Sequence, residues 1–93
     1  MRTIRRTTQF KKDYRRELKG QHRNSLEPDL RALLALLVSD TSLPIKYRDH
    51  PLSGRWKEFR DCHLHPDLVL IYRKPDSNTL ELVRLGSHSE LSF

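Results

Sequence analysis

Five consecutive apolar residues at 68–72 (Leu-Val-Leu-Ile-Tyr) constrain the fold of this chain more than any other feature. His-Pro-Asp precedes them at 65–67 and Lys-Pro-Asp-Ser-Asn follows at 74–78, and both sequences are rich in turn-forming residues. A short apolar segment between two turns is typical of a strand that is buried on both faces. We therefore expect a sheet with this segment at its centre.

The remaining strand signals lie on both sides of this segment. Residues 56–64 and 79–85 predict two strands that join it through the turns, and residues 3–5 predict a short strand near the start of the chain. Strands joined by short turns run antiparallel, so we expect a small antiparallel sheet. Residues 44–55 are predicted to form a loop, because Pro44, Pro51, Ser53 and Gly54 interrupt any regular pattern there.

Two helices are predicted before the sheet. Phe10, Tyr14 and Leu18 recur every four residues after a Thr-Thr cap at 7–8, and Gly20 ends the pattern. A second helix begins at the Ser25 cap and ends at the Asp-Thr-Ser-Leu-Pro sequence of 40–44. Its apolar face consists of Leu26, Leu30, Leu33, Leu34 and Leu37. Because only a short polar turn separates the two helices, we expect a helical hairpin.

The whole pattern predicts an α+β fold in which two N-terminal helices pack on the sheet. At 93 residues the chain fits one domain, residues 1–93, with a small core. It has no apolar run of membrane-spanning length, and Met-Arg-Thr-Ile-Arg-Arg at its start is not followed by the apolar core of a signal peptide. A single cysteine excludes an internal disulfide, so we expect a cytoplasmic protein without membrane contact.

Positive charge is concentrated in the first quarter of the chain. The net charge is +6, and residues 1–24 hold nine Lys or Arg against two acidic residues, whereas the remainder holds nine against ten. Such an excess favours an anionic partner, either a nucleic acid or an acidic protein. A solvated helix face is the simpler alternative. The first helix contributes Lys11, Lys12, Arg15 and Arg16 to this surface.

Histidines in polar surroundings are the best candidates for chemistry. His50 follows Arg-Asp, His63 follows Asp61-Cys62, and His88 precedes Ser-Glu. Asp61 and His63 are two residues apart in a predicted strand and therefore share one face, whereas Cys62 points to the other. Since His50 precedes this strand and His88 follows the last one, a twisted sheet can bring them to one cleft.

Such a set of residues suits metal-free cleavage of RNA. In that reaction the ribose 2′-hydroxyl attacks the adjacent phosphate, a base removes its proton, and an acid protonates the 5′ leaving oxygen. Histidine, with an ordinary pKa of about 6.5, or aspartate can fill both roles, while Arg or Lys stabilises the phosphorane.

Other chemistries have weaker support in the sequence. His63 and His65 could form half of a zinc site, but the chain has no cysteine pair, and two exposed histidines beside a turn are the preferred interpretation. We therefore expect no metal. Cys62 and His63 point to opposite faces and so cannot form a nucleophile–base pair, and no glycine-rich phosphate loop is present.

The most specific pattern spans residues 47–72 and the tail. It comprises Asp-His-Pro-Leu at 49–52, Gly-Arg-Trp at 54–56, Arg-Asp-Cys-His at 60–63, Pro-Asp at 66–67, Ile-Tyr at 71–72 and Arg-Leu-Gly-Ser-His at 84–88. This combination resembles the YafQ branch of the RelE/ParE toxin superfamily. The resemblance covers nearly the whole chain, including the order of helices and sheet.

The resemblance implies a bacterial type II toxin with a compact, microbial-RNase-like RelE fold. Its expected activity is ribosome-dependent endonucleolytic cleavage of mRNA, with no metal or cofactor. The implied partners are the ribosome, mRNA and a cognate antitoxin that has a DNA-binding N-terminal half and a toxin-wrapping C-terminal half. Toxin and antitoxin are expected to form a heterotetramer.

The resemblance also assigns residues. The positions that match His50, His63, Asp67 and His88 are active-site residues in the family, and the position of Asp61 lies close to them. Phe93 would supply the family's C-terminal aromatic side chain, although it comes one position later. RNA and ribosome contacts are expected from Lys11, Lys12, Arg15, Arg16, Arg55, Arg60 and Arg84.

Two alternatives differ in class from a ribonuclease. A ParE-like inhibitor of DNA gyrase would share the superfamily but lacks the histidine set. A plain nucleic-acid-binding module would need the basic surface but not the histidines. The histidines at 50, 63 and 88 favour the enzyme.

Overall fold

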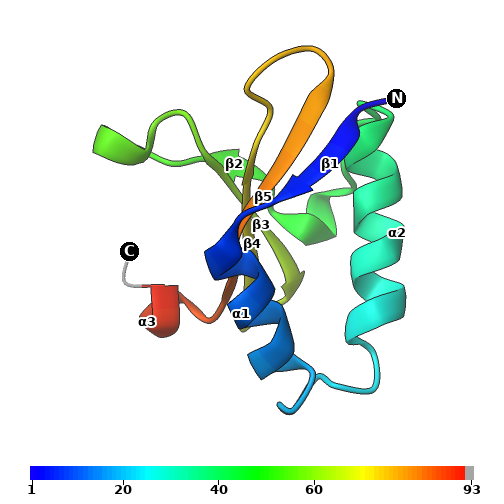
Figure 1. Ribbon diagram of the computed structural model, residues 1–93, viewed down its shortest axis with the longest axis vertical. Helices are drawn as coiled ribbons and strands as arrows, with labels where there is room; N and C mark the ends of the chain where they lie inside the picture. The colour runs from blue at the N-terminus through cyan, green and yellow to red at the C-terminus, as the bar shows by residue number, and fades with distance from the viewer. Residues whose placement is uncertain (92–93) are drawn as a thin grey trace.

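The apolar segment at 68–72 is the central strand of a five-stranded sheet, as expected (Figure 1). The structure is a computed structural model and describes residues 1–91. Its strands are β1 (Thr3–Arg6), β2 (His50–Pro51), β3 (Arg60–His65), β4 (Leu68–Arg73) and β5 (Thr79–Gly86). Its helices are α1 (Thr8–Glu17), α2 (Leu26–Val38), α3 (His88–Leu91) and two 3₁₀ turns, η1 (Ile45–Tyr47) and η2 (Gly54–Trp56).

The sheet is mixed, so the prediction of a wholly antiparallel sheet is wrong. The strand order is β1-β5-β4-β3-β2, and β2, β3, β4 and β5 pair antiparallel with their neighbours. β1 instead runs parallel to β5, with Thr3 opposite Thr79. No tight turn joins these two strands, and the long connection between them permits the parallel direction.

Helix α1 begins where predicted but buries a different face. The Thr7 side chain caps it by accepting a hydrogen bond from the Phe10 amide at 3.0 Å. Phe10 is buried, yet Leu18 is 41% exposed, and the other buried residues of the helix are Asp13 and Glu17. The apolar spacing therefore predicted the helix correctly but not the face that packs on β5.

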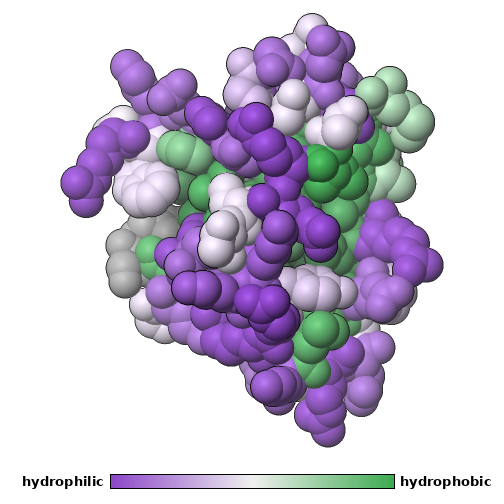
Figure 2. Space-filling model, viewed as in Figure 1, coloured by the Kyte–Doolittle hydropathy of each residue, from purple (hydrophilic) through white to green (hydrophobic). Residues whose placement is uncertain are grey.

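Helix α2 supplies most of the helical part of the core. Its leucines at 26, 30, 33 and 37 are buried, and Leu34 packs partly against them. Ser25 precedes the helix as predicted, but its side chain makes no capping hydrogen bond. Helix α1 packs mainly on β5 and α2 contacts β3, and residues of both helices belong to the same core cluster. An apolar groove lined by both helices and β1 lies between them (Figure 2).

The strand predicted at 56–64 begins later, at Arg60, and continues to His65. The chain turns back on itself before it, because the Leu52 amide bonds to the Phe59 carbonyl at 3.0 Å and η2 lies between them. Gly54 has a φ of +65°, which favours glycine. The predicted loop at 44–55 consequently contains η1 and the short strand β2. No helix within residues 1–91 is long and apolar enough to cross a membrane.

Candidate active site

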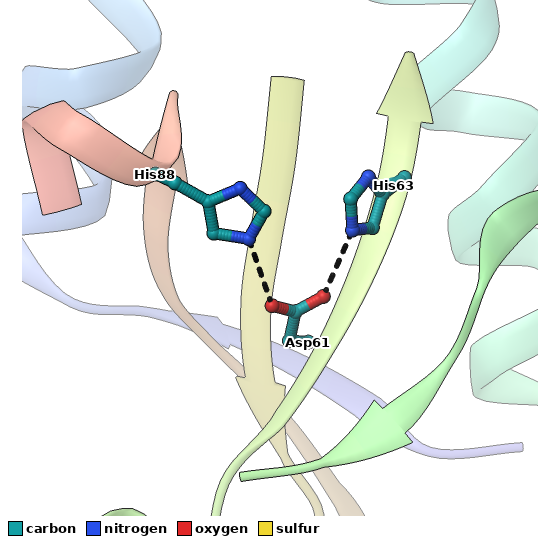
Figure 3. A group of neighbouring side chains, drawn as sticks. All are labelled: Asp61, His63 and His88. Atoms are coloured by element: carbon teal, nitrogen blue, oxygen red, sulfur yellow. Dashed lines mark ion pairs between the residues drawn. The ribbon is translucent and has the colours of Figure 1, made fainter. Parts of the chain in front are cut away.

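Three histidines surround one buried carboxylate. Asp61 is 1% exposed, and its Oδ1 lies 3.4 Å from Nε2 of His63. Its Oδ2 lies 3.5 Å from Nε2 of His88 and 3.8 Å from Nε2 of His50. Figure 3 shows the carboxylate between the rings of His63 and His88, which come from different elements. The predicted convergence of the three histidines is therefore present in the structure.

The sheet explains why these side chains meet. Asp61 and His63 alternate on β3 and so share a face, and His50 on β2 is the cross-strand partner of Asp61. His88 begins α3 directly after β5. Cys62 lies between Asp61 and His63 but points into the core, where burial and the nearby negative charges raise the pKa of its thiol. It takes no part in the cluster.

The segment that carries His50 is anchored at two points. The Asp49 carboxylate accepts hydrogen bonds from Arg60 Nη2 at 2.9 Å and from the Tyr72 hydroxyl at 2.5 Å. Nδ1 of His50 lies 2.7 Å from the Arg48 carbonyl oxygen. A carbonyl only accepts hydrogen bonds, so Nδ1 carries the proton and the neutral ring has its lone pair on Nε2. Arg48 turns its carbonyl toward the ring from a left-handed backbone conformation, with φ of +49°.

The cluster holds unsatisfied polar atoms. Within residues 1–91, neither carboxylate oxygen of Asp61 nor Nδ1 of His63 has a hydrogen-bond partner. The separations of 3.4–3.8 Å bring charge close to the carboxylate but are longer than ordinary hydrogen bonds. A buried carboxylate without hydrogen bonds is costly. The cluster therefore brings three groups that can transfer protons together around one carboxylate.

Asp67 lies apart from this cluster. It occupies the turn between β3 and β4, its side chain is 53% exposed, and its Oδ1 lies 2.8 Å from Nε2 of His22. The Gln21 side chain also donates to it. These hydrogen bonds, the one from His22 first, lower the pKa of Asp67 below its ordinary value. Sequence reasoning missed His22, because it sits in a polar connection between helices and belongs to no motif.

His65 belongs to the same second group. Its ring stacks on His22 with centroids 4.2 Å apart, and its Nε2 lies 3.0 Å from Asp29 Oδ2. The ladder between β3 and β4 is irregular between His63 and His65, and the two rings have different partners. They do not form the half-site considered for zinc.

The expected RNA-binding cations fall into two sets. Arg16 and Arg84 both pair with the fully buried Asp13, and Arg60 pairs with Asp49. These three stabilise the fold. Lys11, Lys12, Arg15 and Arg55 are exposed and take part in no ion pair within residues 1–91, whereas Arg16 is exposed but paired. Phe93, the expected aromatic residue, lies outside the described residues.

Comparison with known proteins decides the family. The profile described as "Bacterial toxin of type II toxin-antitoxin system, YafQ" matches residues 2–93. The chain belongs to the YafQ toxin family. The "mRNA interferase toxin YafQ" of Escherichia coli strain K12 is 39% identical over 90 residues, which cover 95% of this chain and 97% of the relative.

Solved structures of similar toxins share the fold. The E. coli DinJ-YafQ complex contains a chain with a TM-score of 0.83 and 38% identity, and the alignment covers 98% of both chains. A metal-bound toxin from Helicobacter pylori has a TM-score of 0.85 and 46% identity, covering 98% of this chain and 99% of that one. The α+β architecture is therefore that of the YafQ toxins.

The cluster in this YafQ-family chain has a donor set that suits a transition metal. Asp61, His63 and His88 each offer one ligand atom, and these atoms lie within 4.8 Å of one another. Two imidazoles and a carboxylate are ordinary ligands of zinc or copper. A metal on these atoms would occupy the nitrogens that acid–base chemistry needs, so metal binding and proton transfer would compete.

Proposed function

We propose that this protein is an endoribonuclease that cleaves mRNA, the toxin of a type II toxin–antitoxin system, and that its clustered histidines act without a metal ion. The observation that carries the mechanism is the placement of three imidazoles around the buried Asp61. Membership of the YafQ family and a relative named as an mRNA interferase support the activity.

In our proposal His50 is the general base. Its Nδ1 proton is held by the Arg48 carbonyl, which leaves the Nε2 lone pair free to accept the proton of the ribose 2′-hydroxyl. The ring becomes an imidazolium, and the negative charge of Asp61 at 3.8 Å stabilises it. Hydrogen-bond distances in such clusters commonly shorten when substrate binds.

His88 is the matching general acid. Its side chain is 48% exposed and its Nε2 lies on the other side of the cluster, 3.5 Å from Asp61. In the reaction the 2′-oxygen bonds to phosphorus and the bond from phosphorus to the 5′-oxygen breaks. His50 takes the 2′ proton and His88 protonates the leaving 5′-oxygen. The products are a 2′,3′-cyclic phosphate and a 5′-hydroxyl end.

The remaining site residues have supporting roles in this scheme. His63, which is 9% exposed, is the most buried of the three histidines, and its Nε2 lies 3.4 Å from Asp61 Oδ1, where we propose that it helps to position the carboxylate. Asp67 sits at the β3–β4 turn, where we propose that it contacts RNA beyond the scissile bond. Phe93 is retained as a candidate for stacking on a base.

Partners follow from the same proposal. We propose that Lys11, Lys12, Arg15 and Arg55 contact ribosomal RNA, so that cleavage occurs on translating ribosomes in the cytoplasm. A cognate antitoxin is the expected inhibitor, since the E. coli relative was solved as a DinJ-YafQ complex. We propose an antitoxin with a DNA-binding N-terminal half and a C-terminal half that wraps the toxin, in a heterotetramer.

Mapping of mRNA 5′ ends after brief expression tests this function. Wild-type protein should create new 5′-hydroxyl ends on ribosome-bound mRNA, and His88→Ala should not, although both should show the same folded circular dichroism spectrum. A gyrase inhibitor would instead produce DNA breaks and no new RNA ends. Toxicity without RNA cleavage would overturn the proposal.

A further inference from the structure

A second cavity opens directly beside the histidine cluster. It has a volume of about 530 Å³ and lies between η1, the end of β3 and the beginning of α2. His63 lines it, and the same ring faces Asp61 in the cluster. Because His63 belongs to both, a chain whose scissile phosphate lies among the histidines would place an adjoining residue in this cavity.

Two unpaired cations stand on the cavity wall. Lys46 and Arg48 both line it and are exposed, and within residues 1–91 neither forms an ion pair. Lys46 lies over the Tyr47 ring, with Nζ 5.2 Å from its centroid. Arg16, Arg60 and Arg84 are by contrast all held in ion pairs. The guanidinium of Arg48 and the ammonium of Lys46 are therefore available to a phosphate.

The rest of the wall is mixed. Leu64, Pro66 and the exposed part of Tyr47, which is 9% exposed, add apolar surface, and Asp29 and His65, which pair with each other, also line the cavity. Single-stranded RNA is bound mainly by stacking and apolar contact of its bases, with cations on its phosphates. A cavity of this size is within the usual range for small-ligand sites.

The backbone of Arg48 links this cavity to the chemistry. Its left-handed conformation is unfavourable for a residue with a side chain, and such strain gathers at functional sites. The carbonyl of the same residue accepts a hydrogen bond from Nδ1 of His50, and its side chain places a cation on the cavity wall. Contact between the substrate and Arg48 would thus hold the substrate and also set the orientation of His50, the proposed general base.

We propose that this cavity is a nucleotide subsite, in which Lys46 and Arg48 bind a phosphate next to the scissile one and the apolar part of the wall, mainly Leu64 and Pro66, contacts the base. This inference rests on the proposed ribonuclease function. An acidic side chain of an antitoxin is the competing occupant, and the concave, partly aromatic wall beside His63 favours RNA.

The direct test uses a trinucleotide RNA with 2′-O-methyl groups on every sugar, which binds but cannot be cleaved. Titration into ¹⁵N-labelled wild-type protein should shift the amide signals of residues 46–48 and 64–65. Arg48→Gly keeps the left-handed backbone and removes the guanidinium, and Lys46→Ala removes the ammonium. Each should weaken binding about tenfold. Each should also reduce the slope of log binding constant against log salt concentration by about 0.7. Arg48→Lys should recover part of the affinity.

Arg31→Ala is the matched control, since it removes one exposed cation from α2, away from this cavity. It should leave trinucleotide binding unchanged. If Arg48→Gly and Lys46→Ala bind like this control while wild-type protein still cleaves ribosomal mRNA, the subsite is wrong and the ribonuclease function stands. If both variants lose only antitoxin affinity, the cavity is an antitoxin contact and the proposal is overturned. If wild-type protein cleaves no mRNA, the function itself fails, whereas the amide shifts still report the cavity.

Discussion

Nε2 of His22 lies 2.8 Å from Oδ1 of Asp67, so a residue between the two helices holds a residue of the β3–β4 turn. The sequence resemblance predicts an active-site role for Asp67, yet this residue stands apart from the histidines that surround Asp61. Removing the His22 side chain therefore tests what this contact contributes at Asp67.

His22→Ala should raise the pKa of Asp67 toward its ordinary value of 3.8, because the hydrogen bond from His22 is the main cause of the depression. A depressed folded pKa stabilises the folded state at pH above the ordinary value and loses this effect as pH falls through the folded pKa. NMR titration of the side-chain carboxyl carbon measures the shift. An unchanged titration in His22→Ala would mean that the contact has no energetic role.

Asp61→Asn should reduce RNA cleavage about 10²-fold or more, because the imidazolium of the base loses its counter-charge. The same change should raise thermal stability, since it removes a buried charge that has no hydrogen-bond partner within residues 1–91. A gain of about 1 kcal/mol corresponds to roughly 5 °C in Tm. Single-turnover cleavage and calorimetry on one preparation test both effects. If both Tm and activity fell in Asp61→Asn, Asp61 would have a structural role.

Asp13→Ala should destabilise the fold by about 3 kcal/mol, because it strands Arg84 and Arg16 and the Leu85 amide. Burial alone would raise the pKa of Asp13, but hydrogen bonds from Arg84 and from the Leu85 amide lower it overall. Wild-type stability should therefore fall as pH drops below about 4, and this loss should be smaller in Asp13→Asn. Urea unfolding at several pH values measures it.

Glu27→Gln is the control for that series. Its exposed pair with Arg31 is worth at most about 0.5 kcal/mol, so the variant should unfold like the wild type. An equal loss in Glu27→Gln and Asp13→Ala would contradict the central role given to Asp13.

Cleavage should persist in EDTA, and added Cu²⁺ or Zn²⁺ should inhibit it. Both expectations follow from the shared nitrogens, because a metal bound by Asp61, His63 and His88 displaces the protons that the reaction moves. His88→Ala should weaken metal binding as measured by calorimetry. Loss of activity in EDTA that is restored by metal would reverse the mechanism.

Replacing Lys11, Lys12 and Arg15 with Gln should weaken ribosome binding without lowering stability, because all three are exposed. The slope of log binding constant against log salt concentration should fall by up to about 0.9 for each phosphate contact that is lost. Arg16→Gln should instead lower Tm, since its Nη2 donates to the Leu85 carbonyl at 2.6 Å and its guanidinium pairs with Asp13. Equal ribosome affinity in the triple variant would limit this surface to the antitoxin or to solvent.

The features that depend on residues close together in the sequence were predicted correctly. The central strand, the Thr7 cap and the shared face of Asp61 and His63 all follow from spacing along the chain. Interactions across the fold were missed. Nothing near Asp13 in sequence indicates Arg84 as its partner, and the spacing of Phe10 and Leu18 implied a different buried face.

The candidate site shows the same division. The motif identified His50, His63 and His88, and the sheet register brings them together. The partner of Asp67 is His22, 45 residues away, so no local signal could reveal that contact. The parallel direction of β1 was missed for a similar reason, because its partner β5 is the last strand of the chain.

The pairing of the first strand with the last one has a consequence for the cell that makes the protein. β1 leaves the ribosome well before its partner β5 and the α3 histidine. Until β5 emerges, β1 has no neighbouring strand in the sheet and the cluster lacks one of its three rings, and such long-range pairing also forms slowly. An incomplete chain should therefore be unable to carry out the proposed cleavage, and folding of the site has to wait for the last strand.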